Sequence, residues 1–229
     1  MIKLTKRLLA LVAAVFIVCG AAVGTSAKNG IGKAIDDVVF FGDSTTAHLA
    51  VRGGIPKERV WSGNGSTLLF TSVLEKSVCI DGETMSIFDA VGKFKPKILV
   101  ITVGASGGAG FLKEDDFKRI YADMLLGISR SSPKTKIIAQ SILPLSDKSV
   151  KYYKKLTKEA VVQANGWIRE VCAELGVDYL PTHDLLTDKN GYLKSEYQND
   201  EYLHLTSAAY DIILKNLEEY ISTIIYGFK

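Results

Sequence analysis

Unbroken apolar runs recur along the chain, separated by segments in which apolar residues repeat at helical spacing. Apolar runs without alternating polar residues are typical of strands that are covered on both faces, as in a parallel sheet. Four such runs predict strands, over residues 38–41, 97–103, 136–140 and 177–180.

The segments between and after these runs place apolar residues three or four positions apart, which indicates amphipathic helices. They predict helices over residues 115–129, 156–175 and 207–225. Pro133 and Gly176 follow the first two, as expected near helix ends. The alternation of strand and helix predicts an α/β domain over residues 36–229, a three-layer α/β/α sandwich with a central parallel sheet. In such sheets ligands bind beyond the carboxyl ends of the strands, so chemistry is expected in the loops that leave them.

The chain begins with basic residues and an apolar stretch: Lys3, Lys6, Arg7 and residues 8–18. This order, followed by small residues, is that of a secretory signal peptide with cleavage before Lys28. The alternative is an uncleaved anchor, because apolar residues continue to about Gly24, the lower limit of a membrane span. We expect residues 1–27 to be a signal peptide and 28–35 a short linker. The protein is then secreted or lies at the cell surface, and would contact a membrane only through an uncleaved signal segment.

The composition excludes several classes of protein. A chain of 229 residues with 47% hydrophobic and 23% charged residues is typical of a folded globular protein of about one domain. The formal net charge is +3, but residues 1–27 hold three basic residues and no acidic one, so the rest of the chain is balanced. A balanced chain has no electrostatic footprint for nucleic acid, and none is expected as a partner.

Cysteine and histidine give no sign of a metal site. Cys79 and Cys172 remain after the predicted signal peptide, and we expect buried free thiols, although one disulfide would also fit. The three histidines are scattered, and no pair has the spacing of helical metal ligands. Neither a metal nor a cofactor is expected.

The strongest chemical signal follows the first predicted strand, where Gly42, Asp43 and Ser44 lead into a helix. A serine at this junction can present its hydroxyl and its backbone N–H to a ligand, but it needs a base to act as a nucleophile. His204, just before the last predicted helix, is the candidate base, and a carboxylate shortly upstream could orient its ring. Taken alone, Ser44 would be a helix cap and His204 a loop histidine. Their joint occurrence at opposite ends of one domain favours a catalytic pair.

Gly42-Asp43-Ser44, together with a carboxylate-x-x-His segment before the last helix, resembles the SGNH (GDSL) hydrolase superfamily. The resemblance covers the predicted domain and implies a flavodoxin-like fold that hydrolyses esters of lipids, acylated sugars or cell-wall polysaccharides. It implies Ser44 as nucleophile and His204 as base. It also implies an oxyanion hole formed by the backbone N–H of Ser44, a glycine after the second strand, for which we choose Gly65, and an asparagine after the third.

Two departures from the family pattern affect the expected site. Where the family has an asparagine this chain has Ser106, so Ser106 or the neighbouring Asn64 would have to donate to the oxyanion. Loss of one such donor typically costs about 3–4 kcal/mol of transition-state stabilisation. The family aspartate three residues before the histidine is Glu201 here, and Asp200 lies four before it. We favour Glu201 by register, while Asp200 has the matching chemistry.

Ser106 is also a rival nucleophile. It lies in a Gly-x-Ser-x-Gly sequence, residues 104–108, which fits the nucleophile elbow of α/β-hydrolases. That elbow requires a helix directly after the serine, and further glycines at 108 and 110 make a poor helix start. A flexible loop that lines the pocket is the favoured interpretation.

These residues predict an exported serine esterase that removes O-acyl groups, with O-acetyl as the favoured case, from a carbohydrate or cell-wall polysaccharide. Trp61 and Tyr202 could stack on a sugar ring, although packing in the core or at its rim is the favoured interpretation of each taken singly. His48, one helical turn after Ser44, could face the pocket mouth or simply be exposed. An acyltransferase that uses the same residues is one alternative. A catalytically weak or inactive glycan-binding module of the same fold is the other.

Overall fold

The computed structural model describes residues 34–63, 68–200, 202–225 and 227. The chain divides into two compact units, one over Asp37–Asn216 and one formed by Met1–Asp36 with Leu217–Lys229. The predicted signal peptide lies outside the described residues, as does the predicted linker apart from residues 34 and 35. Sheet and candidate site both belong to the Asp37–Asn216 unit.

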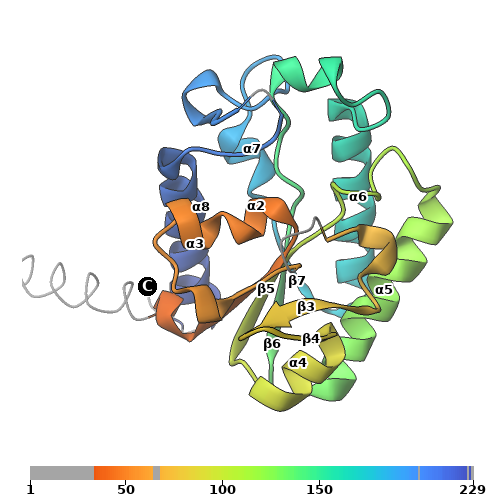
Figure 1. Cartoon of the computed structure of the whole chain (residues 1–229), viewed down its shortest axis with the longest axis vertical. Coiled ribbons are helices and arrows are strands. Elements are labelled where there is room, and N and C mark those ends of the chain that lie inside the picture. The colour runs from red at the N-terminus through yellow and green to blue at the C-terminus, as the bar shows by residue number, and fades with distance from the viewer. Residues whose placement is uncertain (1–33, 64–67, 201, 226, 228–229) are drawn as a thin grey trace, which may run out of the picture. The chain divides into compact units, whose positions relative to one another are not determined.

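A five-stranded parallel sheet forms the centre of this unit, in the order β2-β1-β5-β6-β7. β5 is buried along its whole length, which explains its unbroken apolar sequence. The predicted strands and the α/β fold class are confirmed (Figure 1). The bounds are β1 Val38–Gly42, β2 Val60–Trp61, β5 Ile98–Thr102, β6 Lys136–Gln140 and β7 Asp178–Leu180.

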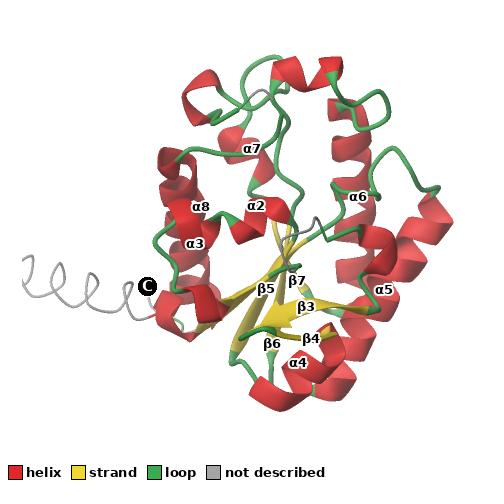
Figure 2. Ribbon diagram, viewed as in Figure 1, coloured by secondary structure: helices red, strands yellow, loops and turns green. Residues whose placement is uncertain are grey.

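Helices flank the sheet on both sides, as Figure 2 shows. The three predicted helices are present, and the last one ends as an α-helix at Tyr220 and continues as a π-helix over Ile221–Ile225. The α-helices are α2 Ser44–Ala47, α3 Leu49–Arg52, α4 Ile87–Phe94, α5 Glu114–Ser131, α6 Lys158–Leu175, α7 His183–Leu186 and α8 Ser207–Tyr220. Short 3-10 helices lie at Ile35–Asp37, Lys57–Arg59, Phe70–Ser72, Asp147–Lys151 and Ser195–Tyr197.

Several elements were missed by the sequence prediction: β2, the β3–β4 hairpin and α4. β2 is only two residues long, too short for a periodic signal. The hairpin strands, β3 Lys76–Ile80 and β4 Glu83–Ser86, are partly exposed, so their apolar residues are interrupted by polar ones. Their turn has Asp81 and Gly82 at positive φ, of 52° and 82°. Such a turn suits a tight hairpin.

Buried aromatic rings support the loop that leaves β5. The ring of Phe70 stacks on Phe117 with centroids 4.5 Å apart, and Phe117 in turn faces Tyr121. The backbone N–H of Phe70 donates to the carbonyl of Ser106 at 2.7 Å. Gly104 opens this loop at φ 120°, and an added Cβ there would lie 3.1 Å from the ring of Phe117. The loop is therefore held against the core.

The two cysteines among the described residues, Cys79 and Cys172, are free and form no disulfide. Cys172 is buried as expected, and burial raises the pKa of its thiol to about 12. Cys79 is only half-buried, because it lies on the partly exposed β3 strand, so the expectation of a second buried thiol is wrong.

Two kinds of feature are absent from the part of the chain that the structure describes. It holds no helix with the length and apolar character of a membrane span. It also holds no group of three or more His, Cys, Asp or Glu side chains that could bind a metal ion.

Gly42, at the end of β1, allows a close approach that no other residue would permit. A Cβ at this position would lie 2.1 Å from the Thr46 hydroxyl oxygen and 2.3 Å from the Thr102 carbonyl oxygen. Gly42 pairs with Thr102 in the sheet, so the second contact is with rigid backbone. The glycine lets the chain turn from β1 into α2 directly against β5.

We expect Gly42→Ala to destabilise the protein by about 1–3 kcal/mol, because the methyl group overpacks this junction. Gly166→Ala is the matched control, since Gly166 lies within α6 and an added Cβ there meets nothing within 4 Å. It should stabilise the protein by up to about 1 kcal/mol. Urea denaturation measures both; equal effects of the two substitutions would contradict the steric argument.

Candidate active site

Ser44 is the first residue of α2, directly beyond the carboxyl end of β1. β1 lies between β2 and β5 in the sheet, at the point where the strand order reverses. Crevices at such reversal points are the usual ligand sites of open α/β sheets. The fold thus places the Ser44 hydroxyl where a substrate can reach it.

Asp43 fixes the turn that carries Ser44. Its carboxylate accepts hydrogen bonds from the backbone N–H and the hydroxyl of Thr45, at 3.0 and 2.8 Å, and so caps α2. Asp43 is buried, and burial raises the pKa of its carboxyl group, against the hydrogen bonds from Thr45 that lower it. Asp43 therefore has a structural role: it stabilises the start of the helix whose first residue is the candidate nucleophile, Ser44.

His204 lies 3.2 Å from Ser44, measured from its Nε2 to the serine Oγ. The two residues are 160 positions apart in the sequence. α8 follows His204 closely, and Tyr210 in its second turn donates a hydrogen bond of 2.7 Å to the backbone carbonyl of Thr45. Figure 1 shows α2 beside the start of α8. The structure therefore brings together the two residues that the sequence paired.

Asp200 is the carboxylate that the structure places on His204. One of its oxygens contacts the imidazole Nδ1. The other accepts from the backbone N–H groups of Tyr202 and His204, at 2.8 and 3.2 Å. The backbone N–H of Asn199 also donates to the carbonyl of His204 at 2.9 Å. The segment thus folds back on itself and carries the carboxylate to the ring.

This arrangement differs from the register argument that favoured Glu201, which lies outside the described residues. An aspartate four residues before the histidine can reach Nδ1 because the tight turn shortens the path between them. The short side chain of Asp200 also bonds the turn's own N–H groups, which is the usual role of aspartate in turns.

The environment of Asp200 favours its ionised form. Partial burial raises the pKa of this carboxyl group, but the hydrogen bonds from Tyr202 and His204 together outweigh burial, so the pKa lies below its ordinary value. An ionised carboxylate on Nδ1 makes Nδ1 the protonated nitrogen and leaves Nε2 free to accept a proton from Ser44. The three side chains form a Ser-His-Asp arrangement able to activate a hydroxyl group.

Other predicted site residues are placed less completely. Asn64 and Gly65 lie outside the described residues. Ser106 is half-buried in the loop after β5, and the next helix, α5, begins only at Glu114. A nucleophile elbow needs a helix directly after its serine, so the geometry at Ser106 is that of a loop. Among the described residues, the hydroxyl that contacts His204 is that of Ser44.

The sequence predicts that His48 is exposed or faces the pocket mouth, whereas in the structure its ring packs against that of His204. The spacing of four residues from Ser44 was the available signal, because it places both on one face of a helix. The partner ring could not be read from the sequence.

A family model of the GDSL-like lipase/acylhydrolase family matches residues 40–212. The chain belongs to this family. The GDSL-like lipases and acylhydrolases are carboxylic ester hydrolases, so this protein is an ester-hydrolysing enzyme by membership.

Solved structures agree with the fold of this GDSL-like acylhydrolase. One is a GDSL-like lipase from Bacteroides thetaiotaomicron (TM-score 0.62, 19% identity, 81% of this chain and 87% of that chain covered). Another is the lipase/acylhydrolase from Enterococcus faecalis (TM-score 0.51, 16% identity, 80% and 94% covered). A third is an acetyl xylan esterase (TM-score 0.53, 15% identity, 80% and 98% covered). A comparison with curated proteins gives no match.

Two grooves lie near the candidate site of this acylhydrolase. One, of about 550 Å³, reaches Asp200 and is lined mainly by charged, amide and hydroxyl side chains between Asp147 and Asn199. The other, of about 790 Å³, runs from Ala47 on α2 to Trp61 and the β3–β4 turn and has more apolar atoms. The first groove meets the candidate site at Asp200, and the second begins at Ala47, three residues after Ser44.

We expect Asp200→Asn to destabilise the protein at pH 7. Since the folded-state pKa of Asp200 is lowered, its ionised form stabilises the fold above the ordinary pKa, and this contribution is lost as the pH falls through the folded value. The stability difference from the wild type should therefore shrink below about pH 4. Denaturation at pH 7 and pH 3 measures it.

Asp123→Asn is the control, because Asp123 lies on the exposed side of α5, 3.8 Å from Arg119. It should change stability by less than about 0.5 kcal/mol at both pH values. A difference for Asp200→Asn that is equally large at pH 3 would contradict the electrostatic interpretation.

Proposed function

We propose that this GDSL-like acylhydrolase is a serine esterase in which Ser44 is the nucleophile, His204 the base and Asp200 the residue that orients His204. The hydrogen bond of 3.2 Å between Ser44 Oγ and His204 Nε2 is the observation on which this rests. Ser44 Oγ attacks the carbonyl carbon of the ester while its proton moves to His204 Nε2. The imidazolium then gives that proton to the departing alcohol oxygen, leaving an acyl-serine.

Water completes the cycle by the same route. His204 takes a proton from water, the hydroxide oxygen attacks the acyl carbon, and the bond to Ser44 breaks as His204 returns the proton to Oγ. The negative oxygen that forms in both steps is stabilised in this proposal by the backbone N–H groups of Ser44 and Gly65, with Ser106 or Asn64 assisting.

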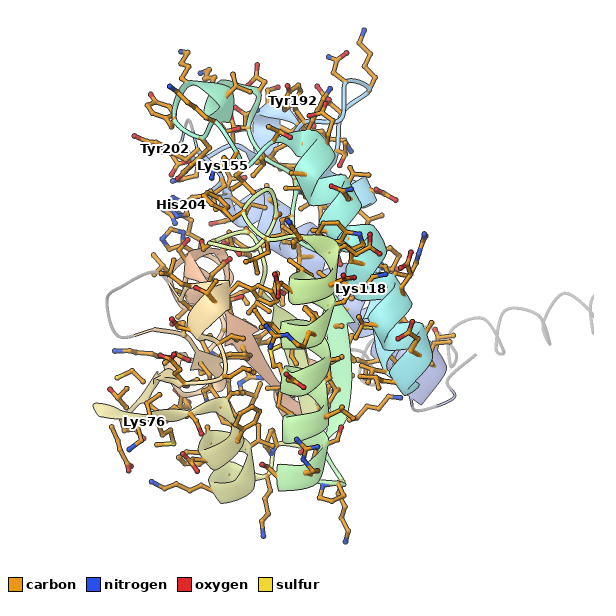
Figure 3. The ribbon with its side chains drawn as sticks, turned by 90° about the vertical axis from the view of Figure 1, so that its right-hand side faces the viewer. Lys76, Lys118, Lys155, Tyr192, Tyr202 and His204 are labelled. Atoms are coloured by element: carbon orange, nitrogen blue, oxygen red, sulfur yellow. The ribbon has the colours of Figure 1, made fainter. Side chains whose placement is uncertain are left out.

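The proposed substrate is an O-acylated carbohydrate. Tyr152 and Tyr202 are exposed, with ring centroids 4.3 Å apart, and the ring of Tyr153 lies 6.2 Å from Tyr202. In Figure 3, Tyr202 and His204 lie at the same end of the molecule. Exposed tyrosine rings suit the apolar faces of sugars, and the polar groove beside Asp200 suits their hydroxyl groups.

A small acyl group such as acetyl is proposed because of a cavity next to the nucleophile. It is bounded by Asp43 and Thr45, the neighbours of Ser44, and by Ala105 and Leu203, and its volume is about 10 Å³. A space of this volume holds about one water molecule, so it favours a small acyl group over a long acyl chain. We also propose export of the protein, which rests on the signal-like sequence over residues 1–27.

The nucleophile is tested by Ser44→Ala beside Ser106→Ala. With p-nitrophenyl acetate, Ser44→Ala should lower kcat by at least about 10³-fold and abolish labelling by a serine-directed phosphonate. Ser106→Ala should keep the label and lower kcat by no more than about 10²–10³-fold, the effect of one lost oxyanion donor. Activity that survives in Ser44→Ala and is lost in Ser106→Ala would overturn the assignment.

The substrate class is tested by Tyr202→Ala and Tyr152→Ala. Each should raise KM for an acetylated polysaccharide by about 5–100-fold, since a stacked ring contributes about 1–3 kcal/mol, and leave KM for p-nitrophenyl acetate unchanged. Val162→Ala, an exposed residue on α6, is the control. Faster hydrolysis of p-nitrophenyl octanoate than of the acetate would contradict the proposed acyl group, and acyl transfer to added sugar would identify an acyltransferase.

A further inference from the structure

His48 makes a ring contact with the histidine of the candidate active site. The centroids of the His48 and His204 rings are 4.5 Å apart, with an angle of 62° between the planes, which is an edge-to-face arrangement. His48 follows α2, and its backbone N–H donates to the carbonyl of Ser44 at 3.2 Å. The turn that presents Ser44 therefore also presents His48 to the other side of the same imidazole.

The side chain of His48 is located by this ring contact rather than by hydrogen bonds. Its Nδ1 is buried and, within the described part of the chain, has no hydrogen-bond partner. Histidine placed for its hydrogen-bonding capacity would not leave a buried ring nitrogen unpaired, since such a nitrogen costs free energy. The ring contact with His204 is therefore the interaction that holds the His48 side chain in place.

Three charged or titratable groups face His48 from the surrounding elements: His204, Arg52 and Asp200. Burial, the proximity of His204 and the positive charge of Arg52 lower the pKa of His48, and Asp200 opposes this shift. Arg52 lies one turn further along, in α3, and its backbone N–H donates to the carbonyl of His48 at 2.8 Å. His48 is therefore uncharged at neutral pH.

We infer that His48 is a positioning residue for His204: its ring packs against the imidazole of His204 and holds that ring toward Ser44. This inference rests on the proposed function. An aromatic neighbour at edge-to-face geometry restricts ring rotation and stabilises its partner. A charged neighbour at the same place would oppose the imidazolium by like-charge repulsion.

The contact can be tested without any substrate. In NMR titrations of the histidine rings, His48 should have a midpoint below that of an ordinary histidine in the wild type. His204→Asn should raise this midpoint, because His204 lowers the pKa of His48, and Asp200→Asn should lower it, because Asp200 raises that pKa. A His48 midpoint that neither substitution moves would overturn the inference.

The kinetic test compares His48→Ala with His48→Phe, which keeps a ring and removes the titratable group. With p-nitrophenyl acetate, His48→Ala should lower kcat by about 10-fold, the effect of losing an aromatic pair, and change KM by less than about twofold. His48→Phe should restore kcat to within about threefold of the wild type. Val162→Ala, at an exposed residue on α6 that lines neither groove, is the control and should leave both constants unchanged.

The pH profile separates positioning from simple packing. Below the titration midpoint of His48, the His48 ring of the wild type becomes positively charged beside His204, whereas the phenylalanine ring of His48→Phe stays uncharged. The ratio of kcat for His48→Phe to kcat for the wild type should therefore rise as the pH falls. Thermal melts of each variant show whether it is folded.

Two kinetic outcomes would overturn the inference: an unchanged kcat in His48→Ala, or a kcat in His48→Phe as low as in His48→Ala. Failure of the proposed function gives a different result, namely no phosphonate label on Ser44 in the wild type. In that case the NMR titrations still decide whether the two histidines are coupled.

Discussion

The hydrogen bond from Tyr210 to the backbone carbonyl of Thr45 joins the two parts of the chain on which the candidate site depends. Both groups are buried, so each would lose free energy without the other. The bond ties the start of α8 to the turn after β1. His204, six residues before Tyr210, is thereby held within reach of Ser44.

The site combines rigid and adaptable parts. Gly42 and Asp43 set the turn at Ser44 through steric fit and capping, both against buried neighbours. The Asp200–His204 segment is partly exposed and is stabilised by its own hydrogen bonds. In this second part the ionised carboxylate of Asp200 determines which nitrogen of His204 carries the proton. The uncharged ring of His48 packs against the imidazole of His204. Preorganised groups of this kind lower the cost of forming charge during a reaction.

The polar surroundings of the site are consistent with a carbohydrate substrate in the proposed function. Exposed tyrosine rings and the polar groove lie on the Asp200 side, while the more apolar groove lies beside α2. A sugar ring has apolar faces and a polar edge, and it could use both kinds of surface at once. Family membership by itself shows only an ester hydrolase.

The long periodic segments were predicted correctly because their buried positions appear in the sequence as a regular pattern of apolar residues. β5 and α5 are buried along a whole strand or one helical face, so their apolar residues follow the strand or helix repeat. β2 and the β3–β4 hairpin were missed, since two residues or partly exposed strands leave no such pattern. The prediction that Cys79 is buried was wrong for the same reason, because Cys79 lies on a strand of this hairpin.

The sequence by itself determined the fold class and the pairing of Ser44 with His204, because strand–helix alternation places both beyond the same sheet edge. Only the tertiary structure decided which carboxylate reaches the imidazole and which ring packs on it. Asp200 reaches the imidazole because of the path of a tight turn. His48 packs on the ring of His204 although the two residues are 156 positions apart in the sequence. Spacing along a chain fixes neither a turn's path nor a distant neighbour, since both result from the packing of the whole domain.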